Sequence, residues 1–195
     1  MKIEKAYYLQ PNVVKLAKDI LGKVLVTRVN QQITSGIITE TEAYNGVVDK
    51  ASHAYRGRRT ARTEVMFAEG GISYVYLCYG IHHLFNIVTN VKEVPHAILI
   101  RAVFPLTGKK VILKRRNSPE LKKGLCIGPG KVSMALGINS SHNEIDLCGP
   151  GSYRDKIWLE DDNIKLNKIL SGPRIGVDYA KEDAKLPYRF WVNEI

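Results

Sequence analysis

The sequence predicts an α+β fold, a single mixed domain over residues 1–195 built on a mostly antiparallel sheet. The chain has 195 residues, a length typical of one domain. Several segments rich in β-branched residues are separated by short turns, a pattern typical of strands that pair as antiparallel hairpins. Helix signals are confined to a few short segments, so strands should dominate the fold.

The N-terminal part of the chain is predicted to form a helix followed by a β-hairpin. The helix spans residues 11–21, because Pro11 is placed to start it and Gly22 to end it. Residues 23–29 and 33–44 are two β-branched segments joined by a short turn, so we expect them to pair with each other.

The second strand of this hairpin carries two carboxylates on a face that is otherwise apolar. Strict alternation places these residues on that face: Ile38, Glu40, Glu42 and Tyr44. A carboxylate there lies either at an exposed edge or in a cleft, where partial burial would raise its pKa and make it a usable general base. For a single strand glutamate, a solvated face is the more ordinary interpretation.

The rest of the chain is predicted to be a loop, then strands interrupted by two helices. Residues 45–62 are loop-like, and strands at 73–77 and 84–89 flank a turn at Tyr79 and Gly80. Further strands are predicted at residues 97–104, 157–159, 174–177 and 189–192. The two helices are predicted at residues 107–116, which are basic, and at residues 129–136.

Composition favours a polyanionic partner. Lys and Arg number 29 against 19 Asp and Glu, which gives a net charge of +10. Such an excess points most simply to nucleic acid, with a basic but inert protein as the alternative. Ten tyrosines stand against four Phe and two Trp. Tyrosine suits a hydrated surface that stacks on bases, although a β-rich core could also use it.

Several other classes of site and location are disfavoured by the sequence. Three widely spaced cysteines form neither a disulfide framework nor a metal or redox motif, and they indicate a reducing cytosolic compartment. His82 and His83 should point to opposite faces of a strand, so we expect no metal site and no cofactor. The N-terminal residues lack the apolar stretch of a signal peptide. Residues 70–91 are uncharged but too rich in glycine and polar groups for a membrane helix.

One arginine lies inside an apolar predicted strand. Arg101 falls within residues 97–104, and a buried guanidinium demands an anionic partner. A glutamate of the strand at residues 33–44 is the obvious partner. Further side chains are close enough in sequence to converge on one pocket with it: Tyr44, His53, Tyr76 and Asn86.

Several long segments are recognisable together. They are ILGKVLV, ETEAYNGVVDKASHAYRGRRTARTEVMF, SYVYLCYGIHHLFNIV, AILIRAVFPLTG, LCIGPGKVSMALGIN, SGPRIGVDYA and PYRFWV. In these segments, which run in order over nearly the whole chain, the sequence resembles the alkyladenine (3-methyladenine, methylpurine) DNA glycosylase family. The resemblance implies a curved, barrel-like sheet with surrounding helices and a protruding β-hairpin. It also implies a bacterial-type minimal enzyme, which we expect to be a monomer in the cytoplasm, associated with the nucleoid.

The resemblance implies catalytic roles for three residues. Glu42, in ETEAY, matches the general base that activates the water attacking the anomeric carbon of a flipped nucleotide. Arg101, in LIRA, matches the arginine that helps to hold Glu42 and the water. Ile175, in PRIGV, matches a position whose backbone carbonyl also reaches that water.

The resemblance also implies contacts with the base and with DNA. The residues that match base-binding positions are Tyr44, His53 and Tyr76, which stack on the extruded base, and Asn86, which crowds a guanine 2-amino group. Tyr79, in CYG, matches the wedge that enters the minor groove and fills the vacated stack. Candidate contacts with DNA are Arg56, Arg58, Arg59, Arg62 and the groove-lining Met66. The basic helix at residues 107–116 is either a second DNA contact or a solvated face.

The predicted function is therefore base-excision repair of double-stranded DNA that contains damaged purines. No lysine is among the residues matched to functional positions, so we expect a monofunctional glycosylase without a Schiff-base intermediate. The lesion class covers 3-methyladenine, 7-methylguanine, hypoxanthine and ethenoadenine, which the sequence does not rank. The alternative is a non-catalytic nucleic-acid-binding module on the same scaffold. Glu42 together with Arg101 argues against it, because a pure binder has no reason to hold a carboxylate in a base pocket.

Overall fold

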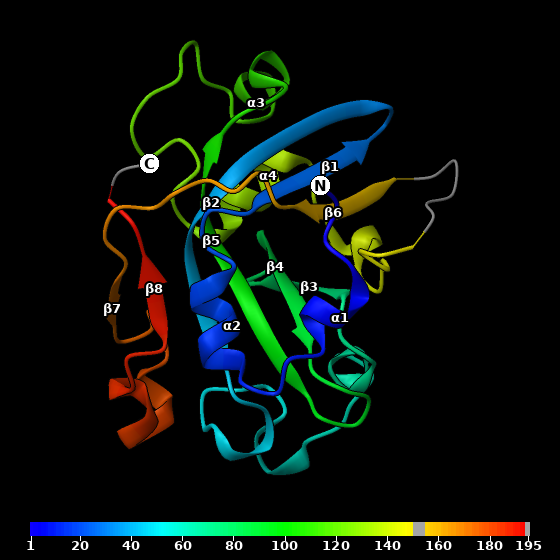
Figure 1. The fold of residues 1–195 in the computed structure, drawn as a ribbon, viewed down its shortest axis with the longest axis vertical. Helices are drawn as coiled ribbons and strands as arrows, with labels where there is room; N and C mark the ends of the chain where they lie inside the picture. The colour runs from blue at the N-terminus through cyan, green and yellow to red at the C-terminus, as the bar shows by residue number, and fades with distance from the viewer. Residues whose placement is uncertain (150–154, 194–195) are drawn as a thin grey trace.

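The computed structural model describes residues 1–149 and 155–193, which fold around one twisted sheet of eight strands (Figure 1). The strands follow the order β3-β4-β5-β2-β1-β6, and β8 pairs with both β2 and β7. Every pairing in the described sheet is antiparallel. The α+β prediction is thus confirmed, and the described sheet stays open rather than closing into a barrel.

The elements follow the sequence prediction closely in the first two-thirds of the chain. The strands are β1 (Val24–Val29), β2 (Gln32–Tyr44), β3 (Ile72–Cys78), β4 (His82–Thr89), β5 (His96–Pro105), β6 (Lys156–Glu160), β7 (Leu170–Gly172) and β8 (Arg189–Trp191). The α-helices are α1 (Lys5–Tyr8), α2 (Val13–Asp19), α3 (Lys109–Arg115) and α4 (Pro129–Leu136). Short 3₁₀ turns lie at Gly46–Val48, Tyr55–Gly57, Glu64–Phe67, Ser140–His142 and Asp178–Lys185.

One predicted strand is wrong. Residues 174–177 are irregular, and the short strand β7 lies just before them. One backbone feature and one long-range contact distinguish this segment from a strand. Gly176 has a positive φ of 74°, outside the extended region, and the side chain of Arg174 binds the main-chain carbonyl of Ala43.

The face assignment of β2 needs one correction. The pairing of β2 with β5 shifts register on both sides of Glu40, which marks a β-bulge. Ile38 consequently packs in the main core with Ala43, instead of sharing a face with Glu40 and Glu42. Because of this bulge, both glutamates lie beside Arg101 while Ile38 stays in the main core.

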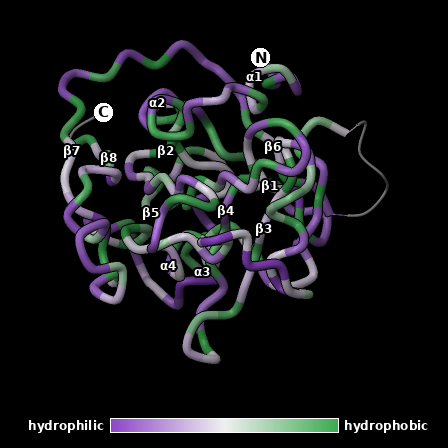
Figure 2. Tube along the Cα trace, turned by 90° about the horizontal axis from the view of Figure 1, so that it is seen from below, coloured by the Kyte–Doolittle hydropathy of each residue, from purple (hydrophilic) through white to green (hydrophobic). Residues whose placement is uncertain are grey.

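A single large hydrophobic cluster holds the sheet and the N-terminal helices together. Alternation along β5 is clear: Ile98 and Ile100 face this cluster with α2, whereas Leu99 and Arg101 face a cavity. Figure 2 shows that hydrophilic residues lie mostly on peripheral segments of the chain. No described helix is long and apolar enough to cross a bilayer.

The sheet register lines up one row of residues across five strands. Tyr74 on β3 lies opposite Asn86 on β4, and Asn86 lies opposite Leu99 on β5. Leu99 in turn pairs with Glu42 on β2, and Glu42 pairs with Arg189 on β8. Residues far apart in sequence are therefore set side by side by backbone pairing alone.

Candidate active site

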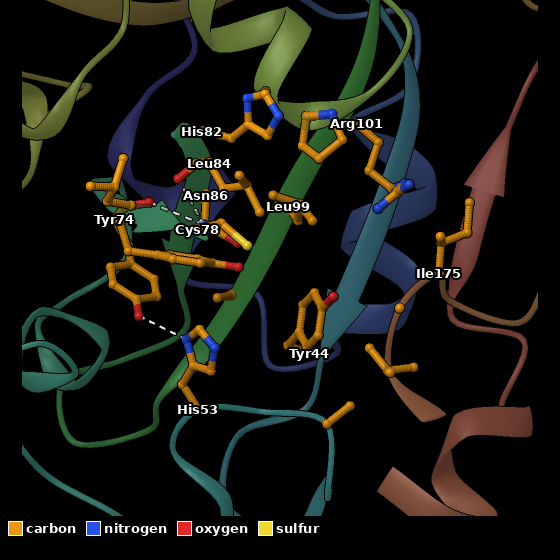
Figure 3. A pocket seen from close by; sticks show the side chains of 18 of the residues that line it. Tyr44, His53, Tyr74, Cys78, His82, Leu84, Asn86, Leu99, Arg101 and Ile175 are labelled. Atoms are coloured by element: carbon orange, nitrogen blue, oxygen red, sulfur yellow. Dashed lines mark hydrogen bonds between the residues drawn. The ribbon is translucent and has the colours of Figure 1, made fainter. Parts of the chain in front are cut away.

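A cavity of about 590 Å³ opens beside this row of residues, within the size range of small-molecule sites. Its walls come from strands β2 to β5, the loop after β2, the start of α4 and the segment that follows β7. The side chains that the argument uses are Tyr44, His53, Tyr74, Tyr76, Asn86, Arg101 and Ile175. Figure 3 shows Ile175 and His53 on opposite sides, with the guanidinium of Arg101 extending toward Tyr44.

Glu42 has no exposed surface on its side chain and lies behind the cavity wall, in contact with the lining residues Tyr44, Arg101 and Ile175. Its Oε1 accepts a hydrogen bond from the amide of Ile175 at 2.8 Å, and Nη1 of Arg101 lies 3.3 Å from the same oxygen. Its Oε2 accepts a hydrogen bond from the hydroxyl of Tyr44 at 2.8 Å. The Ile175 contact thus runs through its amide N–H, a contact that the sequence resemblance did not include.

Opposing forces set the ionisation of Glu42. Burial raises its pKa, while the charge of Arg101, the amide of Ile175 and the hydroxyl of Tyr44 all work to lower it. A raised pKa is what a carboxylate needs to accept a proton from water near neutral pH.

A second carboxylate balances the local charge. Glu40 accepts hydrogen bonds from Nε of Arg101 at 3.0 Å and from Nη1 of Arg189 at 3.2 Å. The predicted need of Arg101 for an anionic partner is confirmed, and it is met by both glutamates. Two buried carboxylates and two guanidinium groups thus offset each other, which removes most of the cost of an uncompensated charge.

Three aromatic rings form the wall opposite Tyr44. The ring centroid of Tyr76 lies 4.8 Å from that of His53 and 5.3 Å from that of Tyr74. Nδ1 of His53 is hydrogen-bonded to the hydroxyl of Tyr74 at 2.8 Å. Burial lowers the pKa of His53 to about 4, and the charges of Arg62 and Arg58 act in the same direction. The imidazole is therefore neutral at physiological pH.

Asn86 is buried at the cavity wall. Its Nδ2 donates to the carbonyl of Tyr74 at 3.1 Å, which fixes the plane of the amide. The structure thus brings the four predicted base-binding residues together around one cavity. It adds Tyr74, which sequence reasoning left unassigned. The alternation of Tyr74 and Tyr76 in one strand was a signal that both rings share a face.

The structure also reveals a buried ion pair that sequence reasoning missed. Arg174 is held by both carboxylate oxygens of Asp49 and donates to the carbonyl of Ala43 at 2.8 Å. Its guanidinium lies over the ring of Tyr44, 4.9 Å from the centroid. Because Ile175 follows directly, this pair ties together three segments of the cavity wall.

The predicted DNA contacts on the surface differ in whether their charge is already paired. Tyr79 is 90% exposed at the tip of the β3–β4 hairpin, with a positive φ of 51°. Arg59 forms ion pairs with Glu64 and Glu93, so its charge is already compensated. The arginines that are exposed and form no ion pair among the described residues are Arg56, Arg58 and Arg62.

Met66 and the basic helix each differ from part of their predictions. Met66 is 1% exposed and packs among Val65, Phe67 and Tyr74, so it supports the cavity wall and does not present a DNA-facing surface. In α3, Arg115 donates to Thr34 and to the carbonyl of Ala135, so this arginine is not simply a solvated charge. In the described ranges, no group of three or more His, Cys, Asp or Glu side chains is arranged to hold a metal.

Comparison with known proteins agrees over the whole chain. The family described as methylpurine-DNA glycosylase matches residues 7–195. A protein of Chlamydia felis is 44% identical over 192 residues, which cover 98% of this chain and 96% of the relative. Relatives in Alkaliphilus oremlandii and Clostridium tetani are each 39% identical over 201 residues, which cover 100% of this chain and 96% and 97% of the relatives. All three are provisionally named 3-methyladenine DNA glycosylases. The chain therefore belongs to the methylpurine-DNA glycosylase family, whose members act on DNA in base-excision repair.

Proposed function

We propose that the protein is a monofunctional glycosylase that flips a damaged purine out of duplex DNA and hydrolyses its N-glycosidic bond, leaving an abasic site. The observation that carries the proposal is the fully buried carboxylate of Glu42, held by two hydrogen bonds and an ion pair with Arg101 beside an aromatic cavity. A protein that only binds nucleic acid gains nothing from the cost of burying this charge.

Base flipping accounts for the cavity and for the exposed hairpin. A base inside a duplex is inaccessible, so it must be extruded at a cost of about a few kcal/mol, which is smaller for a damaged base. A cavity of about 590 Å³ takes the extruded base, and Tyr79 at the hairpin tip fills the space left in the stack.

The aromatic walls account for a broad but purine-directed specificity. Tyr44 on one side and the rings of His53 and Tyr76 on the other accept flat bases of several kinds. Alkylated purines such as 3-methyladenine carry formal positive charge, which aromatic rings attract. Asn86 narrows the wall at the place where we expect a guanine 2-amino group to collide.

The reaction balances with groups in and beside the cavity. A water molecule donates a proton to Glu42 while its oxygen bonds to the anomeric carbon. The carbon–nitrogen bond breaks, and its electron pair leaves with the base. The ionised carboxylate stabilises the oxocarbenium-like sugar during this exchange. A cationic purine leaves as a neutral molecule, so its release needs no other proton donor, whereas hypoxanthine or ethenoadenine must also take up a proton from solvent water as it leaves.

We propose hydrolysis without cleavage of the DNA strand. Lys131 lines the cavity but is exposed, and its Nζ donates to the carbonyl of Gly124. The described cavity wall therefore holds no buried lysine of the kind that forms a Schiff base. We further propose that the protein acts as a monomer on DNA in a bacterial cytoplasm.

The test uses duplexes that contain one hypoxanthine, ethenoadenine, 7-methylguanine or 3-methyladenine. We expect release of the free base, followed by strand nicking only after alkali or an abasic-site endonuclease. A matched undamaged duplex is the control. Tight lesion binding without base release would favour the non-catalytic alternative, and nicking without alkali would contradict the monofunctional mechanism.

A further inference from the structure

The hydrogen bonds of Glu42 leave little room for a water molecule. A carboxylate has about four lone-pair positions, two on each oxygen. Oε1 accepts a hydrogen bond from the amide of Ile175, and its other side faces the guanidinium of Arg101, whose Nη1 lies 3.3 Å away in an ion pair. Oε2 has one donor among the described residues, the hydroxyl of Tyr44. The remaining position is therefore on Oε2, next to that hydroxyl.

The ring of Tyr44 is fixed in place. The guanidinium of Arg174 lies 4.9 Å from its centroid, and Arg174 is itself fully buried in its ion pair with Asp49. Two backbone amides, those of Asn45 and Ala51, also donate to the Asp49 carboxylate. Because Asp49 holds Arg174 and Arg174 packs on the ring, the hydroxyl of Tyr44 is held in one geometry toward Oε2.

We propose that Tyr44 is a positioning residue for Glu42: its hydroxyl holds Oε2 and directs the attacking water to the one remaining lone pair. The inference rests on the proposed function and adds a second duty to a residue that the resemblance assigns only to stacking. The same side chain then forms the platform for the flipped base and orients the group that attacks its sugar.

The charged groups around Glu42 determine how its pKa should change when the hydroxyl of Tyr44 is removed. The charged groups that face or influence Glu42 are Arg101 from β5, Glu40 from β2, Arg189 from β8, which binds Glu40, and Arg174 from the segment after β7. The titratable phenols near it are Tyr44, Tyr76 and Tyr179. The hydroxyl of Tyr44 lowers the pKa of Glu42 against the effect of burial. Its loss therefore raises that pKa further.

The test is the pH dependence of single-turnover excision by Tyr44→Phe. A 7-methylguanine duplex is used at saturating enzyme, because this cationic base needs no added proton to leave. The rate should rise with pH as Glu42 ionises. In Tyr44→Phe the midpoint of that rise should move upward by about one pH unit, with a rate about tenfold lower on the acidic side.

Two further variants separate this effect from other losses. Tyr179→Phe removes a hydroxyl from the same cavity that donates to the carbonyl of Ala51 and not to Glu42, and its midpoint should match the wild type. Tyr44→Leu should show the upward shift together with weaker lesion binding, because it also loses the ring. A Tyr44→Phe profile that superimposes on the wild type would overturn the inference. Inactivity of Glu42→Gln in the same assay would still support the proposed function, even if the Tyr44→Phe profile overturned the inference about Tyr44.

Discussion

Glu42 is a carboxyl side chain with no exposed surface, and Arg101, the amide of Ile175 and the hydroxyl of Tyr44 offset the cost of burying its charge. Arg101 spans Glu40 and Glu42, so removing it would leave two carboxylates short of a cation. Breaking a buried pair in this way costs about 3–5 kcal/mol. The arrangement is therefore stable only as a complete set.

At the residue scale, we expect Asn86→Ala to relax discrimination against undamaged guanine. The truncation removes the amide that narrows the cavity wall, at the loss of one hydrogen bond to Tyr74, worth about 1 kcal/mol. The ratio of guanine release to lesion release should rise by about tenfold or more. This ratio is obtained by measuring the release of free guanine from undamaged duplex and of the damaged base from lesion duplex. A ratio equal to that of the wild type would refute the discriminating role of Asn86 at the cavity wall.

Sequence reasoning predicted that four side chains would converge but missed the ion pair that supports them. Tyr44, His53, Tyr76 and Asn86 were expected to converge, and all four line the same cavity. Asp49 and Arg174 were missed because 125 positions separate them. Nothing local in a sequence reveals an ion pair between two irregular segments.

At the element scale, the β3–β4 hairpin places an aromatic ring in solvent. Tyr79 and Gly80 both have positive φ, 51° and 71°, in the short loop that joins the paired residues Cys78 and His82. Leu77 and Ile81 are also exposed on the hairpin. An apolar tip of this kind is typical of a surface that meets a partner.

We expect Tyr79→Ala to weaken binding and excision on duplex lesions while leaving thermal stability almost unchanged. Its ring contributes little to the core, so truncation costs less than about 0.5 kcal/mol. Excision from single-stranded DNA should suffer less, because no stack has to be refilled. Phe104→Ala is the matched control, since it removes another exposed aromatic ring away from the hairpin. A large drop in melting temperature with equal losses on both substrates would contradict the wedge.

Elements with clear boundary signals were predicted well. Pro129 and Gly137 bracket α4, and the helix spans residues 129–136 as expected. The bulge around Glu40 was not predicted, because a one-residue irregularity leaves no trace in an alternating pattern. The segment at 174–177 was read as a strand from its composition, whereas its shape follows from contacts with Asp49 and Glu42.

At the scale of the whole molecule, the site is assembled by the sheet. The register that aligns Tyr74, Asn86, Leu99, Glu42 and Arg189 draws on five strands, and no single segment carries the chemistry. The α+β class and antiparallel pairing followed from the sequence, since hairpin turns are local signals. The branch at which β2 pairs with β1, β5 and β8 did not follow from the sequence, because it depends on long-range packing.

The central claim is that Glu42 is the general base of a base-excision reaction. The most direct test is single-turnover excision by Glu42→Gln on a lesion duplex, alongside the dissociation constant for the same duplex. Glu40→Gln is the matched control, because Glu40 also binds Arg101 but is not proposed to contact the water. We predict that Glu42→Gln binds lesion DNA nearly as well as the wild type and loses a factor of about 10²–10⁴ in rate, with a much smaller loss in Glu40→Gln. Near-native excision by Glu42→Gln would contradict the account.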